Sequence, residues 1–109
     1  MNTFSKESDL EKNNLDLLKF ACSKEGVPKE KLYIGLSRDF VELSKDKGLE
    51  DKICLLKRDD SMWEVSYIEK GQKSSLSNHS KMFDAINDAW RRLTLENGPW
   101  KYFQEFQNK

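Results

Sequence analysis

One segment constrains the fold more than any other: an alternating run that follows an apolar stretch and a polar turn. The run "MWEVSYI", residues 62–68, places Trp63 and Tyr67 on the same face of an extended strand. The preceding residues 53–57 are apolar, and residues 58–61, "RDDS", have the composition of a tight turn. This order predicts a β-hairpin, which needs further elements to bury its apolar face.

A helix after the hairpin supplies such an element. Gly71 marks a turn, and residues 73–77 predict a short, polar edge strand. Apolar residues then recur at helical spacing: Phe83, Ile86, Trp90 and Leu93. We expect Phe83, Ile86 and Trp90 to pack against Trp63 or Tyr67. Asp88 and Arg92 are expected to pair at i,i+4 on the solvent side of this helix.

The N-terminal third predicts a second amphipathic helix over about residues 9–24, preceded by a flexible stretch at residues 1–7. Gly26 and Pro28 supply its C-terminal stop. Residues 32–36 alternate as a strand. Residues 37–44 are compatible with a strand or a short helix, and periodicity does not decide between them.

The last eleven residues, 99–109, form an aromatic tail or a further short helix. The chain of 109 residues is the size of one domain. The sum is a single α+β domain over residues 1–109. We expect an antiparallel β-meander with an N-terminal and a C-terminal helix packed on one face, in two layers.

Composition narrows the classes of function. The 19 basic and 19 acidic residues cancel, so binding of nucleic acid through bulk positive charge is not expected. No apolar run predicts a membrane span, and the composition of residues 1–11 leads us to expect no signal sequence. Cys22 and Cys54 are the only cysteines, far apart and with apolar neighbours. They predict free, buried thiols in a cytoplasmic protein.

The sequence offers no convincing catalytic, cofactor or metal site. Several serines surround His79, the only histidine, but neither a nucleophile elbow nor a recognisable acid partner accompanies them. Glycine spacing does not form a phosphate loop, and no histidine or cysteine pair has metal-ligand spacing. We therefore expect neither an enzyme nor a cofactor or metal protein.

Residues 53–93, "ICLLKRDDSMWEVSYIEKGQKSSLSNHSKMFDAINDAWRRL", resemble the core of small bacterial immunity proteins that protect cells from contact-dependent or polymorphic toxins. The likeness lies in a W-x-V-x-Y strand, an E-K-G turn, a polar strand and a phenylalanine that opens a helix. The matching residues are Trp63, Val65, Tyr67, Glu69, Lys70, Gly71, Lys73 and Phe83. The stretch "EGVPKEKLYIG" is also similar to the beginning of that family, whereas residues 99–109 have no counterpart in it.

The resemblance implies an inhibitor that binds a cognate toxin domain, typically a nuclease, in a one-to-one complex without contacting nucleic acid or membrane. It transfers no binding residues, because the toxin-contacting surface varies in such families. The residues themselves offer two candidate surfaces. One comprises the hairpin carboxylates, with a second acidic patch elsewhere: Asp59, Asp60, Glu64 and Glu69, then Asp39 and Glu42. The other comprises the tail aromatics Trp100, Tyr102 and Phe103.

Two other classes of function remain open at this stage. One is a non-catalytic binding module such as a secretion chaperone or adaptor, whose mark would be an extended apolar surface. Trp100, Phe103 and Phe106 could supply it. The other is a nucleic-acid-binding accessory protein.

Overall fold

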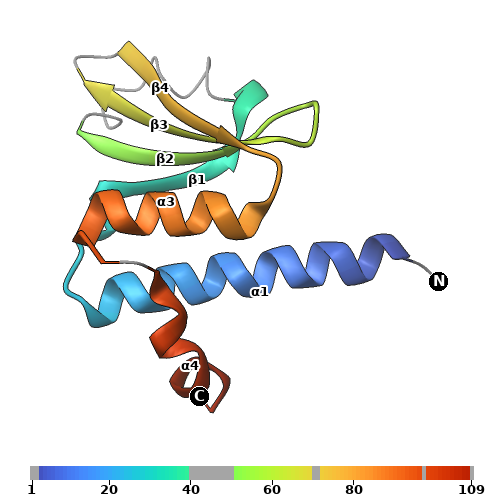
Figure 1. Cartoon of the computed structure of the whole chain (residues 1–109), viewed down its shortest axis with the longest axis vertical. Helices are drawn as coiled ribbons and strands as arrows, with labels where there is room; N and C mark the ends of the chain where they lie inside the picture. The colour runs from blue at the N-terminus through green and yellow to red at the C-terminus, as the bar shows by residue number, and fades with distance from the viewer. Residues whose placement is uncertain (1–2, 40–50, 70–71, 97, 109) are drawn as a thin grey trace.

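A four-stranded sheet in the order β1-β2-β3-β4 forms one layer of the protein (Figure 1). The computed structural model describes residues 3–39, 51–69, 72–96 and 98–108. The strands are β1 (Leu32–Leu36), β2 (Lys52–Lys57), β3 (Trp63–Glu69) and β4 (Gln72–His79).

Helices form the second layer. The long helix α1 (Thr3–Lys24) and the helix α3 (Met82–Thr94) share a core with one face of the sheet. In Figure 1, α3 runs beneath the strands and α1 lies alongside it. A 3-10 turn (Pro99–Tyr102) and the short α4 (Phe103–Gln107) complete the chain against α1. The predicted α+β class, with both main helices on one face of the sheet, is confirmed.

The hairpin is the best-predicted element. β2 and β3 pair antiparallel, with Leu55 opposite Val65, and β4 pairs antiparallel with β3. Apolar side chains on the helix-facing side of β2 and β3 pack with those of the two helices. The buried members of this core are Leu18, Ala21, Cys22, Ile53, Leu55, Trp63, Val65, Ala85, Ile86, Ala89 and Trp90. The sheet edge at β4 is polar and largely exposed, as its sequence predicted.

The expectation of an entirely antiparallel sheet was wrong in one respect. β1 joins the sheet parallel to β2, with Ile34 opposite Leu55, so the sheet is mixed. This register puts Leu32 and Ile34 on the helix side and Tyr33 on the other side. An alternating strand fits either direction equally well, because the alternation only sets which side chains share a face. The direction was therefore decided by tertiary packing.

Two local boundaries also differ. The backbone is helical from Thr3, so residues 3–7 extend α1 rather than forming a flexible stretch. The start was predicted too late because charged helix formers such as Lys6 and Glu7 continue a helix without any apolar signal. Residues 37–39 form a 3-10 turn, whereas residues 40–44 lie outside the described residues. The predicted stop is confirmed: Gly26 has φ +77° just after the helix.

The two cysteines lie on opposite faces of the sheet. Cys22 belongs to the helix-side core, whereas Cys54 packs with Leu56, Ile68 and Tyr33 on the other face. Both thiols are free and buried, as predicted. Because the sheet separates them, they are not placed to form a disulfide with each other.

Candidate interaction surfaces

The β2–β3 turn carries two of the predicted binding carboxylates, and both are exposed. Asp60 accepts a hydrogen bond from the backbone N–H of Met62 at 3.1 Å and pairs with Arg58 at 3.0 Å. Ser61 adopts φ +68° at the end of the turn. Asp60 therefore shapes the turn, while Asp59 has no such bond among those described and projects from the end of the sheet.

Glu64, by contrast, is almost fully buried on the sheet face opposite the helices. It accepts a hydrogen bond from the Ser66 hydroxyl and pairs with Lys73 Nζ at 2.9 Å. Burial opposes its ionisation, but these two partners together hold the pKa of Glu64 below its usual range. A carboxylate enclosed in this way is part of the sheet and is not free to meet a partner.

Glu69 lies at the other end of the hairpin from the turn. It closes β3 on the side of Gln72, whereas Asp59 and Asp60 precede Trp63 at the opposite end. β3 has seven residues, so its two ends are separated by about 20 Å. The four hairpin carboxylates thus do not form one patch. Of the second acidic patch, Asp39 ends the 3-10 turn and Glu42 lies outside the described residues.

The tail aromatic Trp100 packs against α3. Its indole stacks on the ring of Phe83 with centroids 4.4 Å apart, and its Nε1–H donates to Asn87 Oδ1 at 2.5 Å. This contact corrects the prediction for Phe83, which lies 52% exposed and faces the tail rather than the sheet. The helical spacing predicted that Phe83 would be buried with Ile86 and Trp90. Only Ile86 and Trp90 are fully buried in the core.

The rest of the tail packs against α1. Phe20 contacts the rings of Tyr102 and Phe106 at centroid distances of 6.4 and 5.5 Å. The Tyr102 hydroxyl donates to Glu25, and Lys24 pairs with Glu105 at 2.5 Å. Phe103, in contrast, is 47% exposed. The tail is thus a docked structural element, and among its three predicted binding aromatics Phe103 is the one left open.

A buried polar cluster that sequence reasoning missed lies between β4 and α3. The Asp88 side chain is 4% exposed. The Ser77 hydroxyl donates to its Oδ2, and His79 Nε2 lies 3.2 Å from the same atom. Arg91 Nη2 and Arg92 Nε donate to Oδ1 at 3.3 and 3.1 Å. The predicted Asp88–Arg92 pair exists, but it is not on the solvent side of the helix.

The electrostatics of this cluster are those of a satisfied buried carboxylate. Burial opposes ionisation, but hydrogen bonds from Ser77 and His79 and the charges of Arg92 and Arg91 keep the pKa of Asp88 below its usual range. The signal in the sequence was the spacing of Ser77 and His79, two residues apart and hence on the same side of one strand. Their nearness to Asp88 depends on how α3 crosses the sheet.

The geometry of Ser77, His79 and Asp88 differs from that of a hydrolytic triad. In a triad one imidazole nitrogen faces the serine and the other faces the carboxylate. Here His79 Nε2 lies 3.0 Å from Ser77 Oγ and is also the atom next to Asp88. The serine hydroxyl donates directly to the carboxylate. This arrangement orders the β4–α3 contact and does not relay a proton from serine through histidine.

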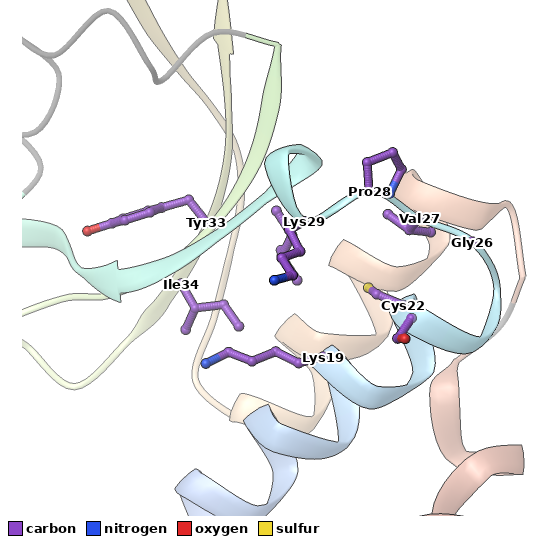
Figure 2. A pocket seen from close by; sticks show the side chains of 10 residues that line it. Lys19, Cys22, Gly26, Val27, Pro28, Lys29, Tyr33 and Ile34 are labelled. Carbon is purple, nitrogen blue, oxygen red and sulfur yellow. The ribbon is translucent and has the colours of Figure 1, made fainter.

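A hollow opens between the end of α1 and β1, with a volume of about 660 Å³ (Figure 2). The residues that line it come from α1, the following loop and β1: Lys19, Cys22, Ser23, Gly26, Val27, Pro28, Lys29, Leu32, Tyr33 and Ile34. None of them was a predicted site residue. Burial raises the pKa of the Cys22 thiol to about 11, so this thiol is not an activated nucleophile.

Within residues 3–39, 51–69, 72–96 and 98–108, no three histidine, cysteine or acidic side chains gather as metal ligands. None of the helices described there is long and apolar enough to cross a membrane. Comparison of the chain with protein-family models, curated proteins and solved structures finds no match.

Proposed function

We propose that the protein is an immunity protein that neutralises a bacterial toxin domain by forming a one-to-one complex. The class of toxin that we propose is a nuclease. The observation that carries the proposal is the segment 53–93. Its sequence resembles the core of small immunity proteins, and it contains β2, β3, β4 and α3. Its core residues Leu55, Val65 and Ile86 are fully buried, so the unit is a rigid scaffold for a binding surface.

The state of the polar groups supports binding rather than catalysis as the function. Among the described residues, the two buried carboxylates Glu64 and Asp88 are each held by structural partners. A catalytic carboxylate would need to face substrate. A stoichiometric inhibitor needs no such group.

The proposed contact surface is the β2–β3 turn together with the edge strand β4, whose C-terminal end lies next to the turn (Figure 1). Asp59 and Asp60 are exposed there, and Arg58 ties the turn to β4 through a 2.9 Å bond to Asn78. The register shift in β4 leaves Leu76 between two paired serines, and this side chain is 39% exposed. Carboxylates would steer a basic toxin cleft, and Leu76 would supply apolar contact.

The first experiment tests binding itself. The protein is co-expressed with the toxin domain encoded directly beside its gene, and the complex is isolated and its stoichiometry measured. A one-to-one complex and rescue of growth are expected. If the protein neither binds nor protects against that domain, the immunity proposal fails.

A second experiment tests the surface by association kinetics. The double variant Asp59→Lys/Asp60→Lys should slow association about tenfold at low salt, because it reverses the steering charge. The control is Asp84→Lys, which reverses one charge at an exposed position on α3 and is compared with each single turn variant as well as with the double one. If the turn variant and the control slow association equally, or if neither slows it, the interface does not include the turn. The proposal that the protein binds a toxin would still stand.

A further inference from the structure

The hollow between α1 and β1 has walls of two kinds, and their arrangement indicates a ligand. On the apolar side, Val27 and Pro28 from the loop face Leu32 and Ile34 from β1. Cys22 closes the floor from α1 and is 7% exposed. The volume of about 660 Å³ lies within the range of pockets that enclose small molecules.

In the described part of the chain, the charged groups that line this pocket all have one sign. Lys19 and Lys29 line it, and no aspartate or glutamate among the described residues does. Figure 2 shows both amines ending in the space between α1 and β1, into which the Ile34 side chain of β1 also points. This is a local departure from neutrality in a chain whose formal net charge is zero.

Glu25 and Asp16, two carboxylates near this pocket, are engaged elsewhere. Glu25 accepts a hydrogen bond from Tyr102 and pairs with Lys101 at 3.4 Å. Asp16 pairs with Lys12 at 3.6 Å. Neither Lys19 nor Lys29 forms an ion pair within the described ranges, although both face an apolar recess. Two ammonium groups beside a hydrocarbon wall complement an anion that carries an apolar chain.

We propose that this pocket binds a free aliphatic monocarboxylate, with its chain against Val27, Leu32 and Ile34 and its carboxylate between Lys19 and Lys29. The apolar walls favour the chain through burial of its hydrocarbon surface. The two lysines attract the anionic head. This proposal does not rest on the proposed immunity function. The pocket lies at the β1 edge of the sheet, whereas the proposed toxin-binding surface lies at the opposite edge, β4.

The test uses the full chain with decanoate as probe, below its micelle concentration, and decanol as its uncharged match. Titration followed by methyl NMR should shift the signals of Val27, Leu32 and Ile34 with decanoate and much less with decanol. Lys19→Gln and Lys29→Gln should each weaken binding about threefold, and the double variant about tenfold, as expected for partly solvated ion pairs. Lys81→Gln, at the start of α3, is the control and should leave the affinity unchanged.

Three results would overturn the proposal. Equal binding of decanoate and decanol would mean an apolar recess with no anion selectivity. An absence of shifts at these three methyl-bearing residues would mean that the pocket takes no such ligand. Co-sedimentation with vesicles of anionic phospholipid that the double lysine variant abolishes would assign the lysines to a membrane surface rather than to a free carboxylate.

Discussion

The ring of Phe83 lies flat on the indole of Trp100, with centroids 4.4 Å apart and an angle of 1° between the ring planes. This stack joins the first turn of α3 to the C-terminal segment. Together with the Trp100–Asn87 hydrogen bond, it fixes the tail against the helix. The pair explains why an exposed phenylalanine opens α3: its partner comes from the end of the chain.

Truncation of the tail tryptophan should therefore destabilise the fold. Trp100→Ala removes the stack and the bond to Asn87, and should lower the free energy of unfolding by about 2 kcal/mol, less than a fully buried aromatic because Trp100 keeps some exposure. Phe103→Ala, at an exposed neighbour, should change it by less than about 0.5 kcal/mol. Urea denaturation measures both. Equal effects would contradict the docked tail.

Trp90 provides a sharper test of the core. It is fully buried, and its Nε1–H has no hydrogen-bond partner among the described residues. Trp90→Ala should cost about 3–5 kcal/mol. Trp90→Phe should cost less than half as much, because it keeps a ring in the site and removes a buried donor that bonds to nothing. If the phenylalanine variant were as unstable as the alanine variant, that donor would have to be bonded in solution.

The buried Asp88 should make stability depend on pH in one direction. Its pKa is depressed below the ordinary 3.8 in the folded state, so the native state favours the ionised form. That contribution is fully present above the unfolded-state value and is lost as the pH falls through the lower folded-state value. Asp88→Asn should therefore cost about 1–2 kcal/mol at pH 7.

The same substitution should cost progressively less as the pH falls below the ordinary value of 3.8, because the preference of the native state for ionised Asp88 is then lost. Urea unfolding at pH 7 and at pH 2.5 compares the two conditions. Asp59→Asn removes one negative charge from an exposed position and serves as the control. An unchanged cost of Asp88→Asn at both values would show that the charge of Asp88 does not contribute to stability.

The two thiols should be nearly inert in the native protein. Burial raises the pKa of Cys22 and of Cys54 to about 11, so at pH 8 roughly one thiol in a thousand is ionised. Reaction with a chromogenic disulfide reagent should be slow in buffer and complete within the mixing time in denaturant. Prompt modification of two thiols in native protein would contradict their burial. Fewer than two reactive thiols in the denatured, reductant-free protein would reveal a disulfide.

Several features could be predicted from the sequence because they depend on local pattern. The alternation at residues 62–68 predicted which side chains of β3 share a face. The polar turn at residues 58–61 predicted that β2 and β3 form a hairpin. The glycine and proline after Lys24 marked the end of α1. In each case the backbone geometry of a few consecutive residues is set by their own side chains.

The candidate surfaces depended on contacts between distant segments, and there the sequence was a poor guide. Glu64 and Asp59 look alike as carboxylates on a hairpin. The sheet brings Ser66 and Lys73 to Glu64, which is therefore a buried structural group, whereas Asp59 stays exposed. The aromatic tail likewise looked free because its partners Phe20 and Phe83 lie tens of residues away.

The sequence by itself determined the elements, their order and the apolar faces they must bury. The tertiary structure decided the parallel direction of β1, the burial of Asp88 and the pocket beside Cys22. The physical reason is one of range. Local conformation follows from steric and hydrogen-bonding preferences of neighbours, whereas the direction of a strand and the burial of a charge follow from which distant groups can satisfy them together.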